Sequence, residues 1–124
     1  MPPVSEGGIP FVCGGFFYDD CYKYAPEIDE WVSSGTLSED RAYSGYGSSE
    51  SWGLVMAGGS STVRLGSVET TFDGETFATL PDIPIENREF CLVVIDDDRI
   101  FTCGGRWTPT DTLIFTKSTG SWTR

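Results

Sequence analysis

Four cysteines give this chain its clearest chemistry, which is either disulfide formation or free thiols. Cys13 and Cys103 each stand directly before a Gly-Gly pair. Cys21 lies on the predicted strand next to that of Cys13, and Cys91 lies on the predicted strand next to that of Cys103. Residues 91 and 103 are symmetric about Asp97, so a tight turn there would place them opposite each other at a separation that suits a disulfide. We predict disulfides Cys13 to Cys21 and Cys91 to Cys103, each worth about 2–3 kcal/mol on the chain-entropy model.

The alternative is four buried free thiols in a cytosolic protein. Zinc is less favoured, because the usual Cys-x₂₋₄-Cys spacing is absent and seven residues separate the first two cysteines. Disulfides would place the parent protein outside the cell or in a lumen. The N-terminal residues MPPVSEGG lack the basic start and apolar core of a signal peptide. We therefore expect an extracellular or luminal protein, with the cytoplasm as the alternative.

The carboxylates do not form an arrangement typical of catalysis. Two clusters, Asp96 to Asp98 and Glu27 to Glu30, fall in turn-rich segments, and the chain has no histidine. Nothing places a nucleophile beside a base. A calcium loop would need alternating ligands around an obligatory glycine, which neither cluster has. We expect no catalytic residue, no metal and no cofactor.

Net charge excludes two classes of partner. The 124 residues contain 19 acidic and 8 basic side chains, a formal charge of −11. Such a chain repels nucleic acid and anionic membrane surfaces. No stretch approaches the length of a transmembrane span. We expect neither nucleic acid nor membrane as a partner.

The cysteines and turns belong to a pattern that recurs three times. Gly-Gly pairs end short apolar runs at steps of 44 and 46 residues. About ten residues later comes a β-former, then a large aromatic seven residues on, and an arginine ten or eleven residues past the first two aromatics. The repeated positions are Gly14, Gly15, Tyr24, Trp31 and Arg41; Gly58, Gly59, Thr70, Phe77 and Arg88; and Gly104, Gly105, Phe115 and Trp122. A repeat of this length is one supersecondary unit that needs a neighbour to bury its apolar face.

Within each repeat the apolar residues alternate or run in stretches of four to eight, which predicts strands. The expected strands of the last unit are 88–95, 99–104, 111–117 and 121–123, and the middle unit fits the same frame from 42 to 80. The first unit begins at its second strand, near Ile9, so we expect about eleven strands in total. The glycines should take positive φ to turn the chain after the second strand.

This combination resembles the kelch repeat, in which an apolar strand ends in Gly-Gly and is followed by Tyr24-x-Pro26, Trp31 and Arg41. Thr70, Phe77 and Phe115 depart from the usual Tyr and Trp. The resemblance implies an all-β chain of antiparallel four-stranded kelch-type blades, an incomplete β-propeller. The expected units are an incomplete blade at 9–40 and blades at 41–87 and 88–124. Trp31, Phe77 and Trp122 would wedge between neighbouring blades.

Fewer than three blades cannot close a ring, since closed propellers use four to eight. Apolar faces would then be bare at both ends. We expect this chain to be a fragment of a larger protein, covered by further blades of the same parent chain. A homo-oligomer that completes the ring is the alternative.

The resemblance implies a non-catalytic protein-interaction module, with a partner of unknown identity. The candidate binding residues lie in the loops after each Gly-Gly pair: Phe16, Phe17, Tyr18, Arg64, Arg106 and Trp107. Aromatic and arginine side chains are enriched at binding hot spots. These aromatics could instead fold back over the blade edges. A second alternative is a scaffold segment of a propeller enzyme such as a copper radical oxidase, whose copper ligands would need histidines that this chain lacks.

Overall fold

The structure, a computed structural model, describes residues 4–6, 9–15, 18–107 and 109–124. In these residues twelve strands form three antiparallel sheets of four strands each, which confirms the predicted all-β class. The first sheet holds β1 (Val4–Glu6), β2 (Ile9–Gly15), β3 (Tyr18–Ala25) and β4 (Glu30–Thr36). The middle sheet holds β5 (Gly45–Ser49), β6 (Gly53–Ala57), β7 (Val68–Thr71) and β8 (Ala78–Leu80). The last sheet holds β9 (Cys91–Val94), β10 (Arg99–Cys103), β11 (Thr112–Thr116) and β12 (Ser121–Thr123).

The first sheet has one strand more than the sequence predicted. We expected this unit to begin near Ile9 and to lack its first strand, but β1 pairs with β2 and sets Val4 opposite Phe11. This strand of three residues contains one strong β-former, so it has no alternation to detect. The expectation of about eleven strands is therefore wrong, and each unit is a complete sheet with its strands in sequence order.

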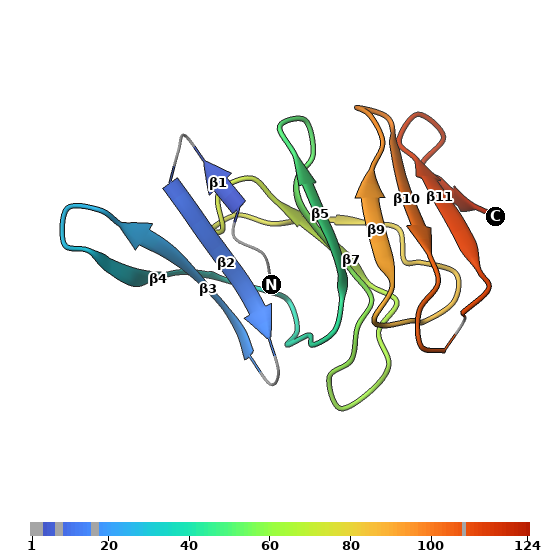
Figure 1. Cartoon of the computed structure of the whole chain (residues 1–124), viewed down its shortest axis with the longest axis horizontal. Coiled ribbons are helices and arrows are strands. Elements are labelled where there is room, and N and C mark those ends of the chain that lie inside the picture. Colours follow the sequence, from blue (N-terminus) through green and yellow to red (C-terminus); the bar gives the residue numbers. More distant parts are fainter. Residues whose placement is uncertain (1–3, 7–8, 16–17, 108) are drawn as a thin grey trace.

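The three sheets stand side by side, with the first and last sheets at opposite ends of the molecule and the middle sheet between them (Figure 1). They do not close into a ring (Figure 1). Only the middle sheet therefore has a described neighbour on both faces.

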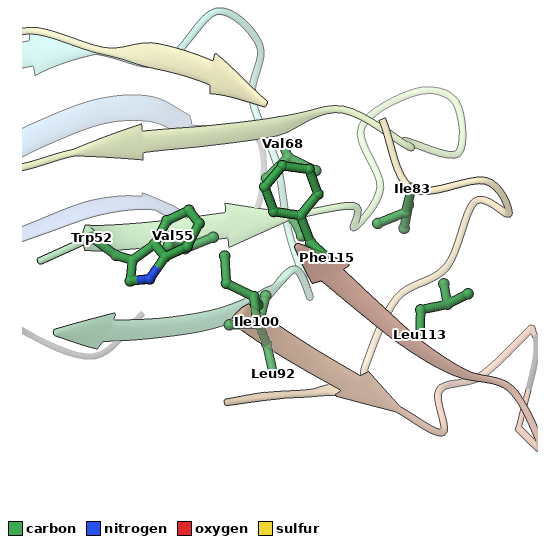
Figure 2. Packing of buried hydrophobic residues seen from close by; sticks show 9 residues of the cluster. Trp52, Val55, Val68, Ile83, Leu92, Ile100, Leu113 and Phe115 are labelled. Carbon is green, nitrogen blue, oxygen red and sulfur yellow. The ribbon is translucent and has the colours of Figure 1, made fainter. Parts of the chain in front are cut away.

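Two apolar layers hold the sheets together. Successive side chains of a strand point to opposite faces, so β6 serves both layers, and all its residues are buried. Leu54 and Met56 pack with Phe11 in the layer toward the first sheet. Val55 and Ala57 belong to the layer toward the last sheet. Figure 2 shows this second layer, with Trp52, Val55 and Val68 of the middle unit near Ile100, Leu113 and Phe115 of the last.

The repeated aromatic residues lie beside these layers. Phe77 packs against the first layer and Trp122 against the second. The indole Nε1 of Trp122 also donates to the carbonyl of Pro81 at 2.8 Å. Trp31 is 50% exposed, because no described sheet covers its face of β4. The predicted wedge between sheets is therefore found for Phe77 and Trp122 and not for Trp31.

The Gly-Gly pairs have positive φ, as predicted, and one pair shows why glycine is needed. Gly58 and Gly59 have φ of 62° and 94°. A Cβ on Gly59 would lie 2.6 Å from the carbonyl oxygen of Ala42. The Gly59 amide donates to the carbonyl of Asn87 at 2.8 Å. The pair thus lets the end of β6 approach the segments that enter β5 and β9.

A buried ion pair fastens the connection between the first and middle sheets. Arg41 is fully buried, and it donates through Nη1 to the carbonyls of Gly58 and Ser67 at 2.8 and 3.0 Å. Its Nη2 donates to Glu69 Oε2 at 2.8 Å. The other oxygen of Glu69 accepts the Ser38 amide at 2.9 Å. Buried charges are tolerated only when they are paired and hydrogen-bonded, so this network holds segment 38–41 on the middle sheet.

The aspartate of the β7–β8 loop organises a second contact between these sheets. Asp73 Oδ1 accepts the amides of Thr76 and Glu75, each at 2.8 Å. These bonds to the charged carboxylate, that from the Thr76 amide foremost, lower the pKa of Asp73 to about 2. The carbonyl of the next residue, Gly74, accepts the Gly35 amide of β4 at 2.8 Å.

Removing the counter-charge of Arg41 should destabilise the fold strongly. Glu69→Gln leaves the guanidinium buried without its ion pair, so we expect the free energy of unfolding in urea to fall by about 3–5 kcal/mol. The control is Glu75→Gln, which removes the 3.2 Å ion pair with Lys23 on a more exposed surface. That loss should be below about 1 kcal/mol. Equal losses in the two variants would contradict the role assigned to Arg41.

Acid should reduce the contribution of Asp73 to the free energy of unfolding. The pKa of Asp73 is lower in the folded chain, about 2, than the ordinary value of 3.8. Its contribution to stability is therefore fully present above about pH 4 and is lost as the pH falls through about 2. Asp73→Asn should flatten this part of the curve of unfolding free energy against pH. An NMR titration that placed the Asp73 pKa near 4 would contradict the hydrogen-bonded loop.

Candidate functional site

The structure brings together predicted binding residues from two different sheets. Strands β2 and β10 end at the same edge of the molecule, the lower edge in Figure 1. At this edge Arg64 comes from the β6–β7 loop and Trp107 from the β10–β11 loop. The Arg64 guanidinium lies over the Trp107 indole, 4.5 Å from the ring centroid. Arg106 is exposed beside them.

The residues predicted in the first unit lie apart from this contact. Tyr18 begins β3 and is 64% exposed. Phe16 and Phe17 lie outside the described residues. The described part of the candidate surface is therefore centred on the loops of the middle and last sheets.

Two further residues extend the contact into a stack. The Arg88 guanidinium lies 5.1 Å from the ring centroid of Trp107 and 5.1 Å from that of Tyr43. Tyr43, Arg88, Trp107 and Arg64 thus alternate rings with cations, and we call these four residues the arginine–aromatic stack. A cation over an aromatic face is stabilised by the ring quadrupole. The repeat pattern in the sequence predicts a structural role for Arg88 and gives no signal for Tyr43.

The side chain of Asn87 holds the stack in place through hydrogen bonds. Its Nδ2 donates to the carbonyl of Gly104 at 2.8 Å, and its Oδ1 accepts the Trp107 amide at 3.2 Å and the Arg88 amide at 3.0 Å. A Cβ on Gly105 would collide with this amide group, so the second glycine of the pair is needed for the loop to close on Asn87. The buried Asn87 side chain therefore ties the Trp107 loop to the segment that carries Arg88.

Tyr43 has an unusual backbone. Its φ is 58°, a left-handed conformation that bulky side chains rarely adopt. The Tyr43 carbonyl accepts the amide of Glu89, another left-handed residue, at 2.8 Å. The two segments that enter β5 and β9 are thereby joined, and Tyr43 is 50% exposed at their surface. Strained backbone of this kind is often found at binding sites.

The stack is a positively charged spot on a strongly acidic chain. In the part of the chain that the structure describes, Arg41, Arg99 and Arg124 each form an ion pair with a carboxylate. Arg64, Arg88 and Arg106 form none with any described carboxylate. Three guanidinium groups at this edge therefore keep donors for a ligand.

A hollow of about 380 Å³ adjoins the stack along strands β5 and β9. Its lining is formed by Tyr43, Ser44, Tyr46, Glu89, Phe90, Cys91 and Leu92. Tyr43 belongs to both the stack and the hollow, so a ligand could contact the guanidinium groups and an apolar recess together.

The cysteines agree with the sequence prediction in one pair of two. Cys13 and Cys21 lie opposite each other and form a buried disulfide, with the Cα atoms 4.1 Å apart. Cys91 and Cys103 are also directly opposite, as the symmetry about Asp97 predicts, but they are free thiols. The predicted second disulfide is therefore wrong for this structure. Partial burial, and to a smaller extent the neighbouring Cys91, raise the pKa of the Cys103 thiol. The higher pKa disfavours the thiolate, which is the form that reacts when a disulfide forms.

The carboxylates of Asp96 and Asp98 in the acidic turn already have hydrogen-bond partners in their own hairpin and in a neighbouring loop. Asp96 accepts the amides of Asp98 and Arg99 at 2.9 Å and pairs with the Arg99 guanidinium at 2.8 Å. Asp98 accepts the Ser118 amide at 2.8 Å. Among the described residues, no three cysteine or carboxylate side chains are grouped so that they could hold a metal ion.

No protein-family model matches the chain, and no curated protein matches it significantly. In the described residues there is also no helix long and apolar enough to cross a membrane.

The number of free thiols and the contribution of the Cys13–Cys21 disulfide to stability can both be measured. Titration of the denatured, unreduced protein should find two thiols per chain, and reduction should lower the free energy of unfolding by about 2–3 kcal/mol because it opens the Cys13–Cys21 loop. The matched control is the variant with Cys91→Ser and Cys103→Ser, which should show no thiols before reduction and the same loss on reduction. Four thiols before reduction would contradict the first disulfide.

Proposed function

We propose that this chain is a non-catalytic protein-interaction module built from kelch-type blades, and that its partner docks through an acidic segment at the arginine–aromatic stack. The observation that carries the proposal is the stack itself, in which Arg64 and Arg88 flank Trp107 and form no ion pair with a described carboxylate. Its groups donate hydrogen bonds and present flat rings, which suits recognition of another chain.

Three features support the kelch-type interpretation. Each repeat contains one four-stranded antiparallel sheet. Each Gly-Gly pair takes positive φ after or at the end of the second strand. Consecutive sheets are packed face to face through the repeated aromatic positions. In such a blade array the loops after the second strands share one edge, which is where the stack lies.

The chemistry of the stack favours carboxylates as ligands. Arginine is planar, so it can stack on an aromatic face while its in-plane N–H groups remain directed outward to bind a carboxylate in a bidentate manner. The rest of the chain is acidic, with a net charge of −11, and would repel an acidic segment elsewhere. The partner segment should therefore combine carboxylates with an apolar side chain that enters the hollow beside Tyr43.

The disulfide supports a location for this module. Cys13–Cys21 is buried under the middle sheet, and disulfides persist in oxidising compartments. We propose that the protein resides outside the cell or in a secretory lumen, with the cytoplasm as the alternative.

The binding proposal can be tested with labelled peptides. We expect an acidic peptide that contains one aromatic residue to bind, and the matched peptide with Gln and Asn for Glu and Asp not to bind, by fluorescence anisotropy. Reversing both exposed charges, with Arg64→Glu and Arg106→Glu, should weaken the acidic peptide at least about tenfold, because two carboxylate contacts become repulsions. Trp107→Ala should weaken it as well, since the stack loses its central ring.

The matched control is an arginine at the opposite edge of the sheets. Arg99 begins β10, far from the Gly-Gly edge, and its side chain is 48% exposed. Arg99→Glu should leave peptide binding unchanged. Acidic peptide binding that survived the double reversal, or that fell equally with Arg99→Glu, would overturn the stack as the binding site.

A further inference from the structure

Two sheet faces of this molecule have no described neighbour, and they lie at its opposite ends. On the last sheet, Val93, Phe101 and Ile114 stand opposite one another across β9, β10 and β11. We call this row, with Ile95, the leading face. On the first sheet, Val12 stands opposite Tyr22, and Tyr24 stands opposite Trp31. We call these four residues the trailing face.

Both faces are apolar and open to solvent. Val93 and Ile95 are 47% and 44% exposed, and Tyr22 and Trp31 are 39% and 50% exposed. The charged neighbour on the leading face, Arg99, is already paired with Asp96 at 2.8 Å. Contiguous apolar surface of this kind marks a protein interface.

The leading face has covered counterparts within the same chain. Phe11 of β2 and Val55 of β6 occupy the position of Phe101 relative to their Gly-Gly pairs. Both are fully buried, Phe11 under the middle sheet and Val55 under the last. The same position is covered wherever a following sheet is present, so the structure contains two examples of the surface that fits the leading face.

The trailing face also has a covered counterpart. Phe115 and Trp122 of the last sheet stand opposite each other, as Tyr24 and Trp31 do in the first. Phe115 is 2% exposed and lies 6.1 Å from the Trp52 ring of the middle unit. The ring centroids of Tyr24 and Trp31 also lie close together, 5.8 Å apart, but Trp31 is half-exposed. The trailing face therefore has the composition of a surface that accepts a leading face.

We propose that a second copy of this chain docks head-to-tail, with the leading face of one copy on the trailing face of the other. The interface continues the sheet-to-sheet packing that occurs twice within the chain. Because the two faces differ, the contact is heterologous, and such contacts close into rings when the rotation allows. Two copies supply six sheets, which lies within the range of four to eight found in closed propellers. This inference is independent of the arginine–aromatic stack.

The test is the assembly state of the 124-residue chain, measured by sedimentation over a concentration series at moderate salt, which screens the repulsion between two acidic copies. The wild type should form a dimer. Trp31→Glu, on the trailing face, and Val93→Glu, on the leading face, should each be monomeric. An equimolar mixture of these two variants should recover a dimer, because one intact leading face meets one intact trailing face.

Controls separate the interface from charge and folding effects. Val63→Glu adds the same charge at a residue that is 63% exposed in the β6–β7 loop, and it should assemble like the wild type. Tyr22→Glu and Ile95→Glu repeat the experiment if either first variant loses its far-UV circular dichroism. A wild type that stays monomeric, a single variant that still dimerises, or a mixture that stays monomeric would overturn the proposal.

Discussion

A four-stranded sheet in this protein is buried only where a neighbouring sheet covers each of its faces, and the other features depend on this constraint. In β6 every residue is buried, since Leu54 and Met56 meet the first sheet and Val55 and Ala57 meet the last. In β9, which has one covered face, buried and exposed residues alternate. A single unit cannot supply both covers for itself, so stability rests on the contacts between units.

The candidate site is a product of the same stacking. Arg64 belongs to the middle unit and Trp107 to the last, so their contact exists only while these two sheets are packed together. Asn87 links them, because its backbone carbonyl accepts the Gly59 amide and its side chain binds the loop of Gly104. The geometry of the stack and the packing of the sheets are therefore coupled through the short segment that connects the middle and last units.

The Gly-Gly spacing and the apolar alternation were enough to predict three sheets and the turn after each second strand, because these follow from local periodicity. The symmetry of Cys91 and Cys103 about Asp97 was enough to predict that they stand opposite each other. The periodicity could not reveal β1, whose three residues carry almost no pattern of their own. Nor could it find Tyr43 in the stack, since that position depends on how the entries to β5 and β9 meet. Opposition on a sheet also does not decide whether two thiols bond, and Cys91 and Cys103 differ from Cys13 and Cys21 in this respect.

Hydrogen exchange of the backbone amides, followed residue by residue by NMR in dilute solution, tests most directly whether covering both faces determines stability. We predict that the amides of β6 and β7 exchange slowest and together, at the rate of global unfolding. Amides of β3 and of β11 should exchange faster, because each of these sheets has a bare face. Equal protection in all three sheets, or slowest exchange in the first sheet, would show that covering both faces of a sheet does not determine its stability.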